Sequence, residues 1–317
     1  GQGHLRPPSQ GARVDDRLVA AYDVGAGAIG LMVCALAKQM GAQQILAVDY
    51  APARLALAAR LGATEIINPG QGMDVEEAAR RCTGGVGVDN IDVDYATSKG
   101  IRIMNTPGAS THAVAELTIA YMFALARPIA QATESMRAGL REKSKFAGIE
   151  LAGKVLGIIG MGRIGAAVAQ RAAALGMVVI GYDSRTVGTA PYMTMVELDE
   201  IYEKADFISL HIPLTESSKH MLNAEVFARM KKGVRIVDCA RGGVIDESAL
   251  YDAITAGQVA GAALDVFENE PLTDRKLFEL PQVIGSPHIG AGTKEATARI
   301  GDEVADILIT VSQEPCN

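Results

Sequence analysis

Aromatic residues are few in this sequence, and its cysteines are scattered. Aromatic side chains make up 4% of the 317 residues and tryptophan is absent, while 49% are hydrophobic, so the core must be largely aliphatic, as is typical of soluble α/β proteins. The four cysteines show no CxxC spacing, which argues against a zinc knuckle and against a disulfide framework. We therefore expect no metal site, reduced thiols and a cytoplasmic location.

Long apolar runs and basic clusters are also missing. No apolar run reaches the length that spans a membrane, and residues 1–17 lack the hydrophobic region of a signal peptide and are expected to form a disordered lead. The net charge of −7 and the lack of any Lys/Arg block argue against a nucleic-acid partner. We expect the chain to bind neither nucleic acid nor a membrane.

Residues 153–183 form the most informative stretch of the chain. An apolar run over 155–159 predicts a buried strand, which leads directly into Gly160, Gly162 and Gly165 ahead of an alanine-rich helix. In such a unit the first glycine permits a tight turn, the second lets a pyrophosphate approach the backbone, and the third allows the helix to pack closely on the strand. The free N–H groups at the helix N-terminus favour a phosphate. The pattern predicts a dinucleotide site.

The second strand of this unit ends at the residue expected to contact the ribose. An apolar run over 177–182 ends at Asp183, eighteen residues after the last glycine. Its carboxylate can accept hydrogen bonds from an adenosine ribose and would repel a 2′-phosphate, which favours NAD over NADP. Arg163 and Ile164, which open the helix, are assigned to the same cofactor site.

Beyond Asp183, apolar runs of strand length alternate with helix-forming segments. This alternation predicts an α/β fold with doubly wound parallel sheets, in two Rossmann-like or flavodoxin-like domains. Ligands of such sheets bind at the carboxyl ends of the strands, which singles out the loops that begin at His211, Arg241, Asp265 and His288. The predicted strands cover 207–210, 234–239, 261–267 and 283–286, and the predicted helices cover 113–126, 196–205, 224–230, 247–256 and 293–311.

The first quarter of the chain repeats the glycine pattern. An apolar strand precedes Gly25, Gly27 and Gly30, each 135 residues before its counterpart, and a second strand closes at Asp49. With the "APARLALAARLGATEIINPG" that follows, this stretch resembles the coenzyme-binding half of zinc-dependent alcohol dehydrogenases over about residues 24–85. The chain has no Cys and His constellation to supply that family's zinc ligands. A second bound nucleotide at this motif stays open.

The motifs "GVGVDNIDVDYATSKGIRIMNTPG", "ARGG", "DVFENEP" and "SPHIGAGT" follow in order from Gly85 onward. With the glycine unit between them, they make about 230 residues of the chain resemble the D-2-hydroxyacid dehydrogenases, most nearly the phosphoglycerate dehydrogenase branch. The resemblance implies NAD-dependent interconversion of a D-2-hydroxy acid and its 2-keto acid. It also implies that the backbone amides of Gly85, Val86 and Gly87 hold the substrate carboxylate.

The same resemblance places the catalytic residues at Arg241, Glu270 and His288. Reduction of a 2-keto acid develops negative charge on the carbonyl oxygen, so a proton donor and a fixed cation are both needed. His288 would exchange the proton, Arg241 would bind the carboxylate and the carbonyl oxygen with its planar fork, and Glu270 would orient the imidazole.

Three further cofactor contacts are implied by the resemblance. Asp265 matches the family residue that contacts the nicotinamide carboxamide, and His211 and Pro213 belong to the loop over the cofactor. We assign His211 to shape and cofactor packing in preference to acid–base chemistry.

The domain organisation follows from both resemblances. We predict an NAD-binding domain over 106–290 and a discontinuous first domain over 17–105 and 291–317. Because the first domain departs from the family, the chain looks like a chimera, and an NAD-binding scaffold with little or no turnover is the alternative to an active enzyme. Thr83 replaces a basic residue of the family, which favours glyoxylate or hydroxypyruvate over a phosphorylated substrate. The family further implies a homodimer through 113–126 and, since the chain ends soon after the last helix, no control by serine.

Overall fold

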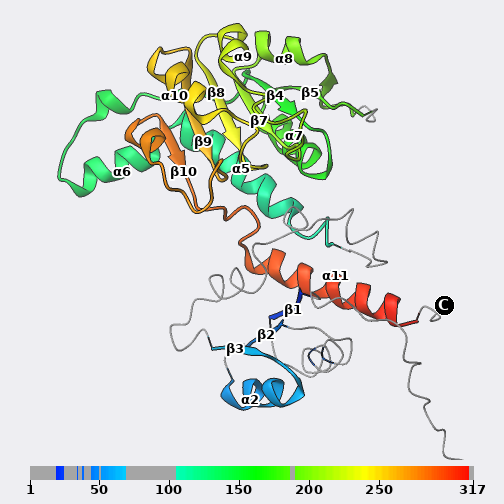
Figure 1. Cartoon of the computed structure of the whole chain (residues 1–317). Coiled ribbons are helices and arrows are strands. Elements are labelled where there is room, and N and C mark those ends of the chain that lie inside the picture. Colours follow the sequence, from blue (N-terminus) through cyan, green and yellow to red (C-terminus); the bar gives the residue numbers. More distant parts are fainter. Residues whose placement is uncertain are drawn as a thin grey trace, which may run out of the picture. The chain divides into compact units, whose positions relative to one another are not determined.

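The computed structural model describes residues 19–24, 34, 38, 44–49, 51–68, 105–185 and 190–313 of the chain (Figure 1). The chain divides into two compact units, Gly1–Asn105 and Thr106–Asn317. The predicted domains, an NAD-binding domain over 106–290 and a first domain that also includes 291–317, stay a prediction.

A seven-stranded sheet, in which every neighbouring pair is parallel, forms the centre of the second unit. β4 (Val155–Ile159) is followed on one side by β5 (Val178–Tyr182) and β6 (Thr194–Met195). On its other side lie, in order, β7 (Phe207–Leu210), β8 (Val234–Asp238), β9 (Val259–Leu264) and β10 (Val283–Gly285). This order confirms the predicted doubly wound α/β fold, and the strand order reverses between β4 and β7.

Helices cover both faces of this sheet (Figure 1). Side chains of α5 and α7 share one buried cluster with one face, and those of α8, α9 and α10 share a second cluster with the other. The helices are α5 (Thr111–Ala126), α6 (Ile129–Arg137), α7 (Arg163–Ala174), α8 (Leu198–Lys204), α9 (Ala224–Arg229), α10 (Glu247–Thr255) and α11 (Lys294–Gln313), with 3₁₀ turns at Lys143–Phe146 and Lys276–Glu279.

The two-residue period of the strands divides the core between these faces. In β4, Leu156 and Ile158 belong to the cluster with α5 and α7, whereas Ile159 belongs to the cluster with α8 to α10. In β7, Phe207 and Ile208 divide in the same way. All five side chains are fully buried, and burial of one such side chain stabilises the fold by roughly 1.5–3 kcal/mol. The aliphatic core expected from the composition is thus organised by strand alternation.

Most predicted elements match the observed ones to within two residues at each end, and β9 is the main exception. The sequence predicts this strand over 261–267, but it begins at Val259, which pairs with Val234 of β8. It ends at Leu264, and the next residue, Asp265, donates its amide N–H to Asp238 of β8 while its carboxylate binds a neighbouring loop. Strand β6 and helix α6 are not predicted from the sequence.

Helix α5 ends at Ala126, ahead of Pro128, and α6 continues at an angle of 62° to it. Pro128 cannot donate an N–H to a continuing helix. Among the described residues, no single helix is long and apolar enough to cross a membrane, although the bent pair of α5 and α6 together has sufficient length and apolar composition. Seven of the 16 residues of α5 are buried in the core of the second unit.

The first unit contains a parallel three-stranded sheet in the order β1 (Val19–Val24), β2 (Gln44–Val48), β3 (Glu65–Ile67) and the helix α2 (Pro52–Leu61). The sequence leaves open whether the third strand lies beyond the second or beside the first. In the structure it lies beyond the second, which is the dinucleotide-type order and the same order as β4, β5 and β6.

We expect Gly165→Ala to destabilise the second unit, because an added Cβ would overlap the carbonyl oxygen of Gly160. Gly301→Ala is the matched control, since it is also a helical glycine but a Cβ there meets open space. The control should stabilise the chain by about 0.5–1 kcal/mol through helix propensity. Urea unfolding followed by circular dichroism measures both changes, and equal effects of the two variants would contradict the predicted packing at the glycine turn.

Candidate functional site

The parallel sheet brings the carboxyl ends of its strands to one edge. Gly160 follows β4, Asp183 follows β5, His211 follows β7 and Asp265 follows β9. Arg241 lies three residues beyond the end of β8, and His288 lies three beyond the end of β10. The cofactor and catalytic residues predicted within the second unit are therefore gathered at this edge, which is where ligands bind in open α/β sheets.

The glycine turn has the backbone geometry of a phosphate site. Gly160 has a φ of +98°, and a Cβ there would overlap the backbone of His211. Gly162 caps α7, no side chain caps the helix, and a Cβ at this position meets nothing within 4 Å. The N-terminal N–H groups of α7 are thus left without a side-chain cap, as the binding of a pyrophosphate at this end requires. Arg163 is exposed and Ile164 half-buried at the start of the same helix.

Asp183 is fixed by the turn that it faces. Its carboxylate oxygens accept hydrogen bonds from the amides of Met161 at 2.8 Å and Arg185 at 2.9 Å. Burial alone would raise the pKa of Asp183, but these two amides and the side chain of Arg185 together lower it. The group is therefore a carboxylate at neutral pH, in the state that can accept bonds from ribose hydroxyls.

His211 is half-buried beside the glycine turn. Its Nε2 lies 2.9 Å from Ser209 Oγ, and its Nδ1 is buried without a hydrogen-bond partner. Burial lowers the pKa of His211 to about 3, so the ring stays neutral near pH 7. This state suits a packing role, while Pro213 in the same loop is exposed.

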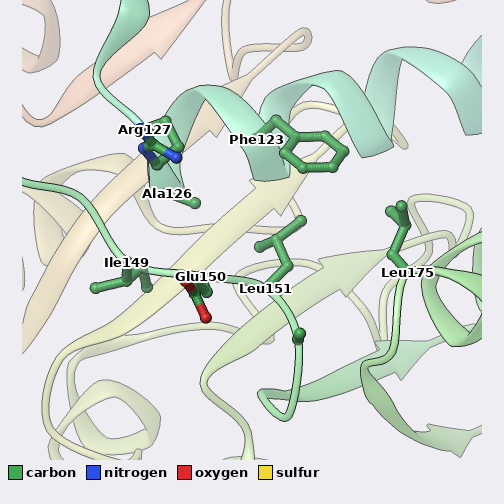
Figure 2. A pocket seen from close by; sticks show the side chains of 8 residues that line it. Phe123, Ala126, Arg127, Ile149, Glu150, Leu151 and Leu175 are labelled. Carbon is green, nitrogen blue, oxygen red and sulfur yellow. The ribbon is translucent and has the colours of Figure 1, made fainter.

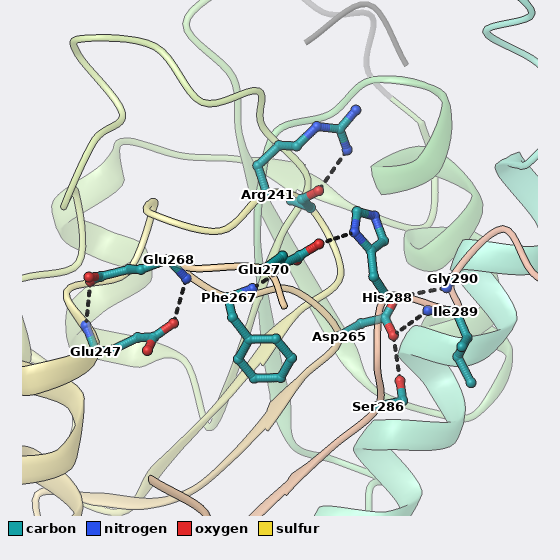
Figure 3. Close-up of polar contacts among 11 residues, drawn as sticks. Arg241, Glu247, Asp265, Phe267, Glu268, Glu270, Ser286, His288, Ile289 and Gly290 are labelled. Carbon is teal, nitrogen blue, oxygen red and sulfur yellow. Dashed lines mark hydrogen bonds and ion pairs between the residues drawn. The ribbon is translucent and has the colours of Figure 1, made fainter. Parts of the chain in front are cut away.

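Asp265 joins the loop that carries His288 to the end of β9 (Figure 3). It is 1% exposed, and its carboxylate accepts bonds from the amides of Ile289 at 2.8 Å and Gly290 at 2.7 Å, as well as from Ser286 Oγ. The hydroxyl of Tyr121 on α5 bonds Ser286 Oγ in turn. Ser286 and Tyr121 are the contacts that sequence reasoning missed, because a hydroxyl on an apolar helix and a serine at a strand end carry no distinctive pattern.

His288 and Glu270 form a direct pair. Nδ1 of His288 lies 2.8 Å from Oε2 of Glu270, and the other carboxylate oxygen of Glu270 accepts the amide N–H of Phe267 at 3.1 Å. The His288 side chain is 46% exposed, and its backbone lies in the left-handed region with a φ of +55°. The ring is thus oriented at Nδ1, so Nε2 is the nitrogen left to face a substrate.

Arg241 lies on an exposed turn whose backbone contacts the Glu270 loop. Its Nη1 donates to the carbonyl oxygen of Ala240 at 2.7 Å. At the neighbouring Gly242, a Cβ would overlap the backbone of Phe267, so the two loops are in close backbone contact. Figure 3 shows Arg241 together with the Glu270 and His288 pair.

Asp238 lies under this turn and is a further feature that the sequence analysis did not single out. It is 2% exposed, and its Oδ1 accepts the amide N–H of Ala240 at 2.8 Å. Burial raises the pKa of Asp238 to about 7, although the Ala240 amide and the charge of Arg241 act in the opposite direction.

The remaining predicted site residues lie in the first unit. Gly85, Val86 and Gly87, and likewise Gly25, Gly27 and Gly30, lie outside the described residues, so their roles stay predictions. Asp49 follows β2 as Asp183 follows β5, and its carboxylate accepts the amide N–H of Ala51 at 2.7 Å and pairs with Arg54 at 3.5 Å. Among the described residues, no three His, Cys, Asp or Glu side chains gather to hold a metal ion.

A cavity of about 290 Å³ lies away from this edge (Figure 2). Its lining includes Phe123 and Arg127 of the α5 end, Ile149 and Leu151 ahead of β4, and Leu175 ahead of β5. Residues that precede parallel strands lie at the amino-terminal edge of the sheet, so the cavity is not part of the cofactor and catalytic site.

Comparisons with known proteins agree with this geometry. The family model described as "D-isomer specific 2-hydroxyacid dehydrogenase, NAD binding domain" matches residues 119–290, and a second model, "Zinc-binding dehydrogenase", matches residues 28–98. The expected cofactor is confirmed at the level of the family, because the first model is an NAD-binding domain.

Curated relatives match the larger part of the chain. A hydroxypyruvate reductase of Thermotoga maritima is 50% identical over 245 residues, which cover 76% of this chain and 78% of that protein. The human D-3-phosphoglycerate dehydrogenase is 49% identical over 244 residues, which cover 76% of this chain and 45% of that protein. The chain thus spans about half the length of the phosphoglycerate dehydrogenases that it matches.

Solved structures match it in fold. A glyoxylate reductase from Paecilomyes thermophila superposes with a TM-score of 0.70 and 32% identity, over 90% of this chain and 85% of that one. A D-lactate dehydrogenase from Aquifex aeolicus, in complex with NAD and lactic acid, gives a TM-score of 0.67 and 31% identity, over 86% and 83% of the two chains.

We expect Asp238 to make stability depend on pH. A carboxyl group whose pKa is raised from 3.8 to about 7 by folding stabilises the protein fully below its unfolded pKa, and that contribution is lost as the pH rises through about 7. The free energy of unfolding of the wild type should fall between about pH 4 and 7 by an extra slope of at most about 1.4 kcal/mol per pH unit. Asp238→Asn keeps the acceptor for Ala240 and should remove this slope. Urea unfolding at several pH values measures it, and parallel pH profiles would refute the expectation.

Proposed function

Because the chain belongs to the D-isomer specific 2-hydroxyacid dehydrogenase family, we propose that it interconverts a D-2-hydroxy acid and its 2-keto acid with NAD as the cofactor. The observation that carries this proposal is the pair of His288 and Glu270 at the carboxyl edge of the sheet, with the Glu270 loop packed against the Arg241 turn. A proton donor and a fixed cation beside a nicotinamide site are what the reduction of a keto acid requires.

The cofactor would be held by groups at the carboxyl edge of the sheet. The N–H groups at the start of α7 would bind the pyrophosphate, and Asp183 would accept bonds from the adenosine ribose. Bound NADH supplies the hydride for the keto acid. Asp265 would contact the carboxamide while its other bonds keep the His288 loop in place, and His211 and Pro213 would pack against the cofactor.

The chain's own residues would donate the proton to the carbonyl oxygen and stabilise the negative charge of the substrate. His288 would give its Nε2 proton to the carbonyl oxygen, and it would take that proton back in the oxidation of the hydroxy acid. Glu270 holds the ring through Nδ1, so Nε2 presents the proton. Arg241 would bind the substrate carboxylate and the carbonyl oxygen through its guanidinium group. The family resemblance also assigns the backbone amides of Gly85, Val86 and Gly87 to the substrate carboxylate.

We propose a small unphosphorylated keto acid, such as hydroxypyruvate or glyoxylate, as the substrate. The match to a hydroxypyruvate reductase over most of that protein's length and to a glyoxylate reductase structure supports this choice. Thr83, which replaces a basic residue of the family, supports it over a phosphorylated acid.

We also propose a cytoplasmic location, which the scattered cysteines support.

A chimeric NAD-binding scaffold with little or no turnover is the second candidate. It is favoured by the match of residues 28–98 to a different dehydrogenase family, ahead of the NAD-binding domain match at 119–290. In this case the protein would bind NADH but would not turn over a keto acid.

We expect wild-type protein to oxidise NADH with glyoxylate or hydroxypyruvate, more efficiently than with phosphohydroxypyruvate. His288→Ala should lower kcat by about 10²-fold or more, because it removes the proton donor. Calorimetry with NADH is the control, since the variant should bind the cofactor as wild type does. Binding without turnover in the wild type would reject the enzyme in favour of the scaffold, and equal turnover of both proteins would reject the role of His288.

We also expect a homodimer through the exposed apolar surface at the end of α5 and the start of α6. Phe123, which lines the cavity of Figure 2, is 40% exposed, and Ile129 is 61% exposed. Phe123→Asp should therefore yield monomers in light scattering, because it places a charge in a buried apolar contact. Leu61→Asp on α2 is the control, as a similarly exposed side chain outside this surface, and it should leave the dimer intact. A monomeric wild type would contradict the assignment.

A further inference from the structure

We propose that His220, Glu247 and Glu268 form a clamp that fixes the Arg241 turn against the Glu270 loop, and that all three are positioning residues for the reaction. The proposal rests on the proposed function. It concerns side chains that do not reach the substrate and that the family resemblance does not assign.

The first part of the clamp is a reciprocal pair of hydrogen bonds (Figure 3). The amide N–H of Glu247 donates to Glu268 Oε1 at 3.0 Å, and the amide N–H of Glu268 donates to Glu247 Oε1 at 2.7 Å. Glu247 is the first residue of α10, six residues beyond Arg241, and Glu268 stands two residues before Glu270. Each carboxylate thus satisfies an amide of the other segment, and the two catalytic loops are joined at their bases.

The second part is His220, which bridges both loops from a third. Its amide N–H donates to the carbonyl oxygen of Gly243 at 2.8 Å, and its Nε2 lies 3.2 Å from Glu268 Oε1. The residue adopts a left-handed backbone with a φ of +48°. Such a conformation is uncommon outside glycine, which indicates that surrounding contacts hold His220 in place.

The charges explain why a histidine suits this position. Burial raises the pKa of Glu247, and the nearby carboxylates of Glu268 and Asp274 act in the same direction, although the amide of Glu268 opposes them. Two carboxyl groups in such proximity repel each other when both are ionised. His220 places its Nε2 against the shared oxygen of Glu268, with which it forms an ion pair when the ring is protonated.

The clamp reaches the catalytic groups through a short path. Phe267, next to Glu268, donates its amide N–H to Glu270 Oε1 at 3.1 Å, and its carbonyl group packs on Gly242 beside Arg241. A shift of Glu268 therefore moves both the carboxylate that orients His288 and the turn that carries the guanidinium group. A displacement of about 1 Å at reacting groups can cost about a hundredfold in rate.

His220→Asn is the main test, because Asn tolerates the left-handed backbone but its side chain is too short to reach Glu268. We expect kcat/KM for the keto acid to fall about tenfold, with the NADH dissociation constant changed less than about twofold. His220→Gln places an amide donor near the position of Nε2 and should restore kcat/KM to within about threefold of wild type. Lys219→Ala, at the exposed neighbouring residue, is the control and should have no effect.

Hydrogen exchange separates the clamp from the proposed activity. The amides of Glu247 and Glu268 should exchange faster in His220→Asn than in wild type and recover in His220→Gln, whether or not the protein turns over a keto acid. If His220→Asn exchanges faster than wild type at these amides and the wild type turns over no keto acid, the clamp is retained and the proposed function is rejected.

Two results would overturn the clamp. One is wild-type exchange at both amides in His220→Asn. The other is a lowered melting temperature with unchanged kcat/KM in an active enzyme, since a purely structural residue would behave in this way.

Glu268→Ala, His220→Asn and the double mutant that combines them form a double-mutant cycle, which measures the coupling between the two residues. Because the two residues share one contact, their effects on kcat/KM should be less than multiplicative. Fully multiplicative losses would contradict the clamp.

Discussion

Parallel pairing of the strands is the constraint on which the rest of this molecule depends. Every ladder in the seven-stranded sheet is parallel, so each strand ends at the same edge and each following loop begins there. Residues that are far apart in the chain, such as Gly160 and His288, thereby reach a common surface without any direct contact between them. Parallel pairing also demands crossover helices, which bury both faces and leave the loops as the exposed, chemically variable part.

The loops themselves are held by carboxylates that bind backbone amides. Asp183 fixes the glycine turn, Asp265 fixes the loop after β10, and Glu270 fixes its own turn through Phe267. These bonds satisfy amides that a loop would otherwise leave to water, and they orient side chains with little dependence on loop packing. The acidic residues of the site therefore support the structure as well as the chemistry.

Much of this arrangement could be predicted from the sequence, because it depends on local patterns. The apolar runs identify β4 and β7 to the residue, and the three glycines with Asp183 identify the dinucleotide turn. Contacts between loops could not be predicted in the same way. The bonds that the amides of Ile289 and Gly290 donate to Asp265 connect residues 24 and 25 positions apart. His220 shows the same limit, since no pattern around it indicates that it reaches Glu268. The order of the strands in the first unit also depends on tertiary pairing, and the sequence was compatible with either order.

The path of bonds around His288 has a consequence for the preceding part of the chain. The described hydrogen bonds that hold His288, Glu270 and Asp265 all come from residues within Thr106–Asn317, and Arg241, Glu270 and His288 fall inside the stretch that matches a single family model. The His288–Glu270 pair and the loop bonds that position it are thus internal to the second unit. Replacement of the segment that precedes this stretch would remove none of the partners of these hydrogen bonds.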